Sequence, residues 1–186
     1  MWPWGHLAVG YLLWSQLARD RRGQPPTGSE AILLAVGTQF PDLVDKPLAW
    51  TFGVLPNGRS LTHSALVAGV VVAVVVLVCN GRDRPLLGAA FGVGYGVHLA
   101  TDALPTVVAG HYADLAFLAW PLLPPVEYET QQSFTAHFLG IEPTPLFLLQ
   151  ILLSAVALVA WVRDGLPGIA ELRAAVDAGR AAVTDL

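Results

Sequence analysis

Charged residues are scarce in this chain of 186 residues. Asp, Glu, Lys and Arg make up 13% of the sequence, hydrophobic residues make up 54%, and the mean hydropathy is +0.57. Because a typical soluble domain contains about 25% charged residues, this composition excludes an ordinary soluble protein. The single cysteine, Cys79, excludes an internal disulfide. The sequence also contains no internal repeat and no low-complexity tract.

The sequence contains long apolar runs. Three stretches are nearly free of polar side chains, at 64–79, 86–101 and 146–162. Each is slightly shorter than the ~20 residues that cross a bilayer, but interfacial flanks complete a crossing. A soluble helical core can hide one such segment, but hardly three. The runs therefore predict an integral membrane protein.

Two further helices precede these runs. The apolar stretch at 7–18 is followed by arginines, whereas a signal peptide carries its positive charge first, and no small-residue cleavage site is present. We therefore expect it to be a retained helix. A second helix begins near Glu30 and is expected to bend or break around Pro41. The predicted fold is an all-α bundle of about five transmembrane helices over residues 1–165.

The remaining segments are predicted to be peripheral. Pro105 is expected to end the fourth run, and residues 105–145 to form short interfacial helices and loops. In the tail, 166–186, the spacing of Ile169, Leu172, Val176 and Val183 predicts an amphipathic helix, which Gly179 could interrupt. Such a helix would lie on the inner membrane surface or bind a cytoplasmic protein partner.

Basic residues are distributed unevenly between the connections. If five helices cross in turn with the amino terminus outside, eight of the ten Lys and Arg residues lie in the cytoplasm, and the reverse orientation places two there. The eight are Arg19, Arg21, Arg22, Arg82, Arg84, Arg163, Arg173 and Arg180, and the other two are Lys46 and Arg59. This asymmetry predicts a multi-pass plasma membrane protein with a cytoplasmic carboxyl terminus.

Histidine and aspartate recur at the ends of the apolar runs. The residues are His6, Asp42, Asp45, His63, His98 and Asp102. The topology, which rests on Lys and Arg alone, brings all of them to the outer side. Imidazoles and carboxylates are the usual protein ligands of zinc and similar divalent metals. Placing ionisable groups in a membrane costs free energy, so their presence there indicates a function. The pattern therefore predicts a metal site assembled between helices.

Each of these residues also has a structural interpretation. His98 and Asp102 share a helix face at four-residue spacing and can form an interfacial hydrogen-bonded pair. Asp42 and Asp45 can cap a helix start, and His63 can be an interfacial residue beside a cap. His6 can anchor the chain at the membrane surface. The combination points to a metal site, because the helices could have brought these groups to either side.

The motifs around these residues resemble a known family. They are His6, Gly37-Thr38-Gln39-Phe40-Pro41-Asp42, Arg59-Ser60-Leu61-Thr62-His63-Ser64 and Gly94-Tyr95-Gly96-Val97-His98-Leu99-Ala100-Thr101-Asp102-Ala103-Leu104, followed by Trp120-Pro121. In this order they are similar to the YdjM-type membrane-bound, metal-dependent hydrolases, which are also described as inner-membrane proteins that bind the LexA repressor. The resemblance covers roughly residues 1 to 125. It implies a multi-helix membrane protein with a divalent metal site.

A more distant similarity concerns the order His, Asp, His, His-x-x-x-Asp, which is similar to zinc-dependent phospholipase C and the P1-type nucleases. In that pattern the metal ligands are His6, Asp42, His63, His98 and Asp102. Those enzymes cleave phosphoesters with several more ligands and a free amino-terminal Trp, whereas this chain starts Met-Trp. The number of metal ions therefore stays open.

The leading hypothesis is a membrane-embedded metallohydrolase with its site at the outer leaflet. A bound Zn²⁺ or similar ion lowers the pKa of its water from ~15.7 towards ~7. Asp45 is the predicted spare carboxylate that orients or deprotonates the water, and Arg59 is the predicted partner of an anionic substrate oxygen. The expected partners are membrane lipids and a small or lipid phosphoester substrate, with no direct contact with nucleic acid. Solvated loop positions are expected for His111, Asp114, Glu127, Glu129 and His137, the first two also being candidates for an outer contact of the site.

Two other functions stay open. The chain could be a non-enzymatic membrane interaction protein in which the His/Asp cluster is structural and the tail recruits a partner. It could also be a cation-coupled transporter, but transporters often contain repeats and place ionisable groups near the middle of the membrane. Neither feature is present here.

Overall fold

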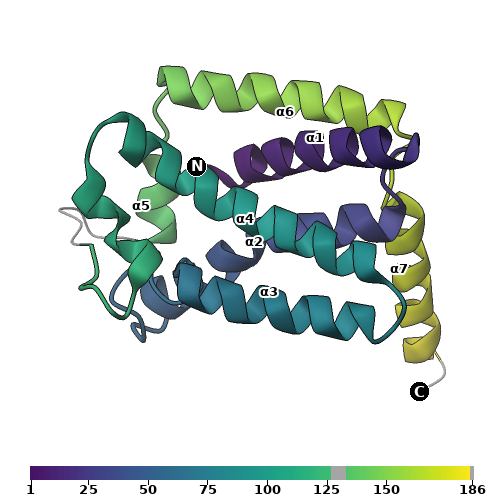
Figure 1. Cartoon of the computed structure of the whole chain (residues 1–186), viewed down its shortest axis with the longest axis horizontal. Coiled ribbons are helices and arrows are strands. Elements are labelled where there is room, and N and C mark those ends of the chain that lie inside the picture. The colour runs from purple at the N-terminus through teal and green to yellow at the C-terminus, as the bar shows by residue number, and fades with distance from the viewer. Residues whose placement is uncertain (127–132, 185–186) are drawn as a thin grey trace.

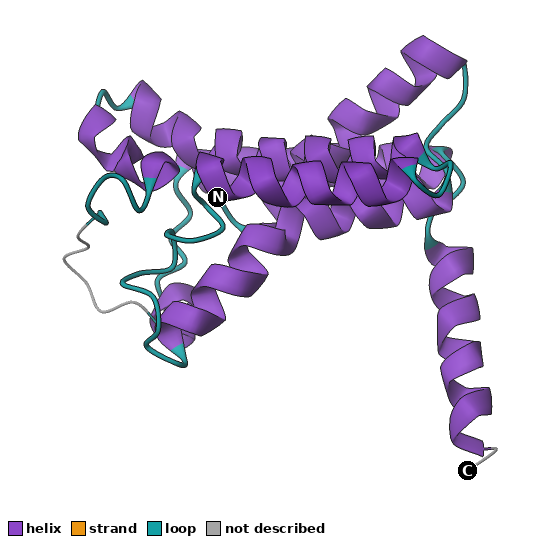
Figure 2. Cartoon of the chain, turned by 60° about the horizontal axis from the view of Figure 1, so that its bottom comes forward, coloured by secondary structure: helices purple, strands orange, loops and turns teal. Residues whose placement is uncertain are grey.

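The structure is a computed structural model that describes residues 1–126 and 133–184, and helices are the only regular elements in these residues (Figures 1 and 2). The long helices are α1 (Pro3–Arg22), α2 (Gly28–Trp50), α3 (Ala65–Asn80), α4 (Pro85–Val108) and α6 (Pro145–Arg163). The shorter elements are the 3-10 helix η1 (Tyr112–Ala119), α5 (Phe134–Leu139) and the tail helix α7 (Ile169–Thr184). The prediction of an all-α fold is confirmed.

The five long helices lie side by side and alternate in direction. Gln39 in the middle of α2 donates to the carbonyl of Pro3 at the start of α1, whereas Arg22 at the end of α1 pairs with Glu30 near the start of α2. The two helices are therefore antiparallel. The same reasoning makes α4 parallel to α2, since Gly94 lies against Leu34 and His98 against Thr38. It also makes α6 parallel to α1, since Trp2 contacts Gln150 and Arg19 pairs with Asp164.

The alternation gives the bundle two unlike ends. At the site end, α1, α3 and α6 begin, α2 and α4 end, and η1, α5 and most of the loops gather on the left of Figure 1. At the arginine end lie the α1–α2 and α3–α4 connections and the link from α6 to α7, with the arginines Arg19, Arg21, Arg22, Arg82, Arg84 and Arg163. The helix α7 points away from the bundle at this end (Figure 2).

The helix α2 does not break at Pro41, although a break is one of the two outcomes expected there. The helix α2 continues through Pro41 and Pro47 to Trp50, and α4 likewise continues past Pro105 to Val108. An interior proline removes one backbone hydrogen bond and strains the preceding turn, but α2 is held on both sides by α1 and α4. As a result, Asp42 and Asp45 lie about one turn apart inside one helix and do not cap a helix start.

Two glycines set the separation of α2 and α4. A Cβ atom added at Gly37 would lie 2.3 Å from the carbonyl oxygen of Phe91, and one added at Gly94 would lie 2.4 Å from that of Leu34. Small residues of this kind let two helix backbones approach closely inside a membrane. Because His98 is one turn beyond Gly94 and Asp42 is just over one turn beyond Gly37, the contact also sets the distance across the His/Asp cluster.

Exposed apolar surface is concentrated on two of the long helices, α6 and α3. Among the described residues, α6 alone has both the length and the hydropathy of a membrane span, with a mean hydropathy of 2.3 over an 18-residue window of which 11% is buried. The core helix of a soluble protein would be mostly buried. The helix α3 is also apolar and exposed at Leu66, Val70 and Val74, but it is shorter at 16 residues. The number of crossings is therefore not decided by helix length and composition.

The tail forms the helix that its periodicity predicts, and that helix runs unbroken through Gly179. Its predicted apolar stripe is largely exposed, with Leu172 54%, Val176 53% and Val183 72% accessible. The start of α7 is held against the bundle, because the Trp161 indole donates to the carbonyl of Pro167 at 3.0 Å and Gly168 packs against Ile32 of α2.

Candidate metal centre

Histidines from three segments meet in the buried centre of the site end. His6 comes from α1, His63 from the loop before α3, and His98 from α4, and all three are fully buried. The rings of His6 and His98 stack with centroids 3.9 Å apart. The Nε2 atoms of His63 and His98 are 3.1 Å apart. Groups separated by up to about ninety residues in sequence thus form one cluster.

The outer nitrogen of each ring identifies its tautomer. Nδ1 of His98 lies 2.7 Å from the backbone carbonyl of Thr38, which can only accept a hydrogen bond, so this nitrogen carries the proton. Nδ1 of His63 likewise lies 2.8 Å from a carboxylate oxygen of Asp45. Both rings therefore direct the lone pair of Nε2 into the cluster.

His6 follows the same pattern through Thr101. The Thr101 hydroxyl donates to the carbonyl of Val97 at 2.8 Å, so its oxygen accepts from Nδ1 of His6 at 2.7 Å. The Nε2 atom of His6 is then unprotonated, buried and without a hydrogen-bond partner among the described residues. Buried polar atoms are rarely left in this state.

Two carboxylates complete the cluster. Oδ1 of Asp42 lies 3.5 Å from Nε2 of His63 and 3.8 Å from Nε2 of His98. Oδ1 of Asp102 lies 3.4 Å from Nε2 of His6, and its Oδ2 lies 3.7 Å from Nε2 of His63. Both aspartates are buried, at 8% and 4% exposure respectively.

The donor set fits a divalent cation. Ligands about 2.0–2.1 Å from a tetrahedral zinc lie about 3.3–3.4 Å from one another, which is close to the separations found here. Two groups of donors can hold an ion, His6 with His98 and Asp102, and Asp42 with His63 and His98. Unprotonated imidazole nitrogens and carboxylates suit zinc and neighbouring transition metals.

Asp45 lies behind His63 instead of facing the cluster. Its carboxylate accepts from the backbone N–H groups of Ser60 at 2.9 Å and Thr62 at 2.9 Å, from the Thr62 hydroxyl at 2.7 Å, and from His63. The side chain has no exposed surface. Both oxygens of the Asp45 carboxylate therefore hold the loop at Ser60 and Thr62 and the ring of His63.

Burial and charge act in opposite directions on His63. Burial lowers the pKa of its imidazole, but the carboxylates of Asp42 and Asp45 outweigh burial and raise the pKa above its ordinary value. A proton at Nε2 can thus take the place of a metal ion between His63 and His98. The carboxylates of the cluster therefore attract a positive charge, which is either this proton or a metal ion.

Cations flank both carboxylates at the edge of the cluster. The Lys46 ammonium bonds to Oδ2 of Asp42 at 2.6 Å and lies 5.5 Å from the ring centre of Trp50. Nε of Arg59 lies 3.0 Å from Oδ2 of Asp102, and 34% of the Arg59 side chain is exposed. The amino group of Met1 also pairs with Asp102.

Other predicted candidates lie apart from the cluster. His111 and Asp114, considered as outer contacts, are exposed beside and within η1. Glu127 and Glu129 lie outside the described residues, as does the side chain of His137. A different residue of η1 reaches the site, since the ring of Phe117 contacts His63 edge-on with centroids 6.3 Å apart.

Sequence reasoning missed several supporting residues. Thr101 is three residues from His98 and one before Asp102, so helical spacing could have placed it on the same face. Lys46 could have been found in the same way from Asp42. The carbonyl of Thr38 leaves no signal in the sequence, because any residue supplies a carbonyl and only the α2–α4 contact brings it to His98.

The comparisons with known proteins agree with the motif resemblance. A family model described as "YdjM inner membrane protein" matches residues 1–176, farther along the chain than the motifs reach. No curated protein and no solved structure matches the chain. The similarity to phospholipase C and P1-type nucleases therefore rests on the order of the motifs alone.

Proposed function

The chain belongs to the YdjM inner membrane protein family, and on that premise we propose that it is a membrane-bound, metal-dependent hydrolase. The proposed ligands of the divalent ion, zinc by the type of donors, are His6, Asp42, His63, His98 and Asp102. The observation that carries the proposal is the convergence of three buried histidine Nε2 atoms on two buried carboxylates. A bound ion of this kind supplies an electrophile and acidifies a water at neutral pH.

Asp45 and Asp42 have different roles in the proposed reaction. Asp45 keeps His63 in the tautomer that presents Nε2 to the cluster, so we assign it to positioning and no longer favour it as the base. Asp42 is the more exposed of the two inner carboxylates and is better placed to accept a proton from an attacking water. In this role the Oδ2 atom of Asp42 would release the Lys46 ammonium and form a hydrogen bond with the water instead.

The cations suggest the charge of the substrate. Arg59 and Lys46 each touch a carboxylate of the cluster while keeping exposed surface, 34% and 13% of their side chains respectively. Both therefore keep accessible surface at the edge of the cluster, where a substrate can contact them. Arginine and lysine at this position favour an anionic oxygen, which supports a phosphoester of a lipid or another small molecule.

The bundle supports a five-crossing topology for the proposed enzyme. The long helices alternate in direction, the cluster lies at one end, and six arginines lie at the other. The positive-inside rule then places the site end, with Lys46 and Arg59, on the outer side. On this arrangement the substrate approaches from the outer leaflet.

Hydrolysis by the purified, zinc-loaded full chain in lipid vesicles tests the proposal. The substrates are bis-(p-nitrophenyl) phosphate and a phospholipid labelled in its headgroup, each with and without a chelator. Chelator-sensitive hydrolysis that falls at least a hundredfold in His98→Ala and is retained in His111→Ala is expected. Undiminished hydrolysis in His98→Ala would contradict the assignment.

A non-enzymatic interaction protein is the second candidate. It is favoured by the exposed stripe of α7, where Leu172, Val176 and Val183 are each more than half accessible. Under this alternative the metal would stabilise the bundle and α7 would bind a cytoplasmic protein. Stoichiometric metal binding without hydrolysis of either substrate would favour it.

A further inference from the structure

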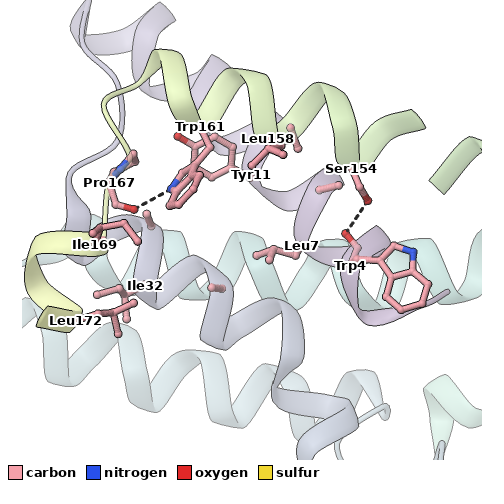
Figure 3. Close-up of a pocket in the computed structure, with 15 residues that line it drawn as sticks. Trp4, Leu7, Tyr11, Ile32, Ser154, Leu158, Trp161, Pro167, Ile169 and Leu172 are labelled. Carbon is pink, nitrogen blue, oxygen red and sulfur yellow. Dashed lines mark hydrogen bonds between the residues drawn. The ribbon is translucent and has the colours of Figure 1, made fainter. Parts of the chain in front are cut away.

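A second feature of the molecule is a cavity of about 430 Å³ between α1, α2, α6 and the start of α7. In Figure 3, Trp161, Ile169 and Leu172 surround one end, Trp4 lies at the other end, and Leu7 lies between them. His6 lies on another side of α1, against Thr101 of α4. The cavity is therefore separate from the candidate metal centre and does not depend on hydrolase activity.

The wall of the cavity is apolar, and most of its polar atoms are already hydrogen-bonded within the protein. The Ser154 hydroxyl donates to the carbonyl of Gln150 at 2.7 Å, the Trp161 indole to Pro167 at 3.0 Å, and the Tyr11 hydroxyl to Asp164 at 2.7 Å. Of the lining residues that the structure describes, Trp4 alone keeps a buried donor without a partner. Such a wall selects a hydrocarbon ligand over a polar one.

The size of the cavity favours an acyl chain over a partner helix. A helix about 10 Å across with a pitch of 5.4 Å occupies about 420 Å³ per turn, so the cavity holds roughly a single turn. A flexible acyl chain is much thinner and can follow the groove from Trp161 to Trp4. Such chains are abundant around an inner membrane protein, and the α6 wall of the cavity has the length and hydropathy of a membrane span.

The charge at one end of the cavity indicates the headgroup. The cavity ends on α7 at Leu172, which Arg173 follows, and on α6 at Trp161, two residues before Arg163. Both arginines are exposed. Nearby, Arg19 and Arg22 keep 46% and 29% of their side chains exposed although they pair with Asp164 and Glu30. Basic groups beside an interhelical groove attract anionic lipid headgroups.

We propose that this cavity binds one acyl chain of an anionic phospholipid, whose headgroup lies among the arginines at the start of α7. The lipid would fill the space that α1, α2 and α6 leave between them. It would also fix α7 to the bundle, because Ile169 and Leu172 would pack against the bound chain.

Native mass spectrometry of the full chain, released from vesicles of phosphatidylglycerol and phosphatidylcholine in equal amounts, tests the proposal. One retained phospholipid per chain is expected, with phosphatidylglycerol preferred by at least about fivefold for each arginine that contacts the headgroup. Retention of both lipids in equal amounts, or of neither, would overturn the proposal.

Cavity-filling variants locate the lipid. Ala157→Phe on α6 and Ala35→Phe on α2 place a ring in the cavity from different walls, and each is expected to abolish retention. The matched control is Ala155→Phe, which lies on the exposed face of α6 and should retain lipid as the unmodified protein does. Retention in both filled variants would show that the lipid binds elsewhere.

A second measurement does not depend on those variants folding correctly. In vesicles that contain phosphatidylglycerol with brominated acyl chains, the tryptophan fluorescence of the chain should be quenched more strongly than in vesicles of the brominated phosphatidylcholine, because bromine quenches only at short range and Trp4 and Trp161 line the cavity. The excess quenching should decrease in Trp161→Phe, and the remainder should come from Trp4 at the other end of the cavity. Equal quenching by the two lipids would contradict a specific site.

Discussion

The Nε2 atoms of His63 and His98 face each other at 3.1 Å in the buried centre of the bundle. Each ring carries its proton on Nδ1, bound to Asp45 in one case and to the Thr38 carbonyl in the other, so two lone pairs are directed at one another. Such a contact is repulsive unless a cation or an additional proton lies between the nitrogens. This pair of histidines is therefore the part of the proposed metal site that depends most on a bound cation or an additional proton.

Removal of His98 should empty the site. We expect His98→Ala to lower the metal content of the purified protein at least tenfold, because His98 belongs to both donor groups that can hold an ion. Elemental analysis after purification without added chelator measures this. The control is His111→Ala, which removes an exposed histidine at the same end. Full metal occupancy in His98→Ala would support a structural role for the cluster.

Asp45→Asn tests positioning against base catalysis. Asparagine would direct an NH₂ group towards N–H groups from which Asp45 now accepts hydrogen bonds. His63 would then lose the partner that orients its ring. We expect metal affinity to fall by about 10–100-fold, as for other residues that orient a ligand. Isothermal titration with Zn²⁺ measures the affinity. Unchanged affinity with slower hydrolysis would instead restore Asp45 as the base.

Gly37→Ala tests the contact between α2 and α4. Its methyl group would lie 2.3 Å from the carbonyl oxygen of Phe91, so the helices must separate at a cost of about 1–3 kcal/mol. Both the unfolding temperature and the metal content should fall. The matched control is Gly96→Ala, which has open space around the added carbon and should be neutral or stabilising. Equal behaviour of the two variants would show that the close approach is not needed.

Asp164 should make stability depend on pH. Burial raises the pKa of its carboxyl, but hydrogen bonds from Ser15, Tyr11 and Arg19 outweigh burial and hold the pKa below its ordinary value. A lowered folded-state pKa contributes stability above the ordinary value of about 3.9, and this contribution is lost as the pH falls through the folded-state pKa.

We expect Asp164→Asn to be about 1–2 kcal/mol less stable than the unmodified protein at pH 7, since hydrogen bonds to a charged group are the stronger ones. The difference should shrink towards pH 3. Unfolding in detergent between pH 3 and 7 measures it, with Asp177→Asn on the exposed surface of α7 as the control. A difference that does not change with pH would show that the carboxyl charge has no role.

Cysteine labelling tests the orientation in the membrane. In a Cys79→Ser background, we expect Val54→Cys, in the exposed loop after α2, to react with an impermeant maleimide added outside. Arg82→Cys, in the α3–α4 turn, should react only after the membrane is permeabilised. Labelling of Arg82→Cys from outside would reverse the topology and place the candidate site in the cytoplasm.

The sequence by itself determined the helical class, the apolar character of the surface and the residues from which the cluster is built. These properties follow from composition and from local spacing. The stripe of Ile169, Leu172 and Val176 predicts a helix because only neighbours along the chain are involved. The common end of His6, His63 and His98 follows from the alternation of helices, which the basic residues also indicate.

Only the tertiary structure decided the chemical state of each group. Nδ1 of His98 is protonated because of a carbonyl sixty residues away in sequence, and Asp45 faces away from the cluster because the loop at Ser60 and Thr62 closes over it. The helix α2 continues past Pro41 because α1 and α4 hold it from both sides. These outcomes depend on contacts between distant segments, and such contacts arise only when the helices pack.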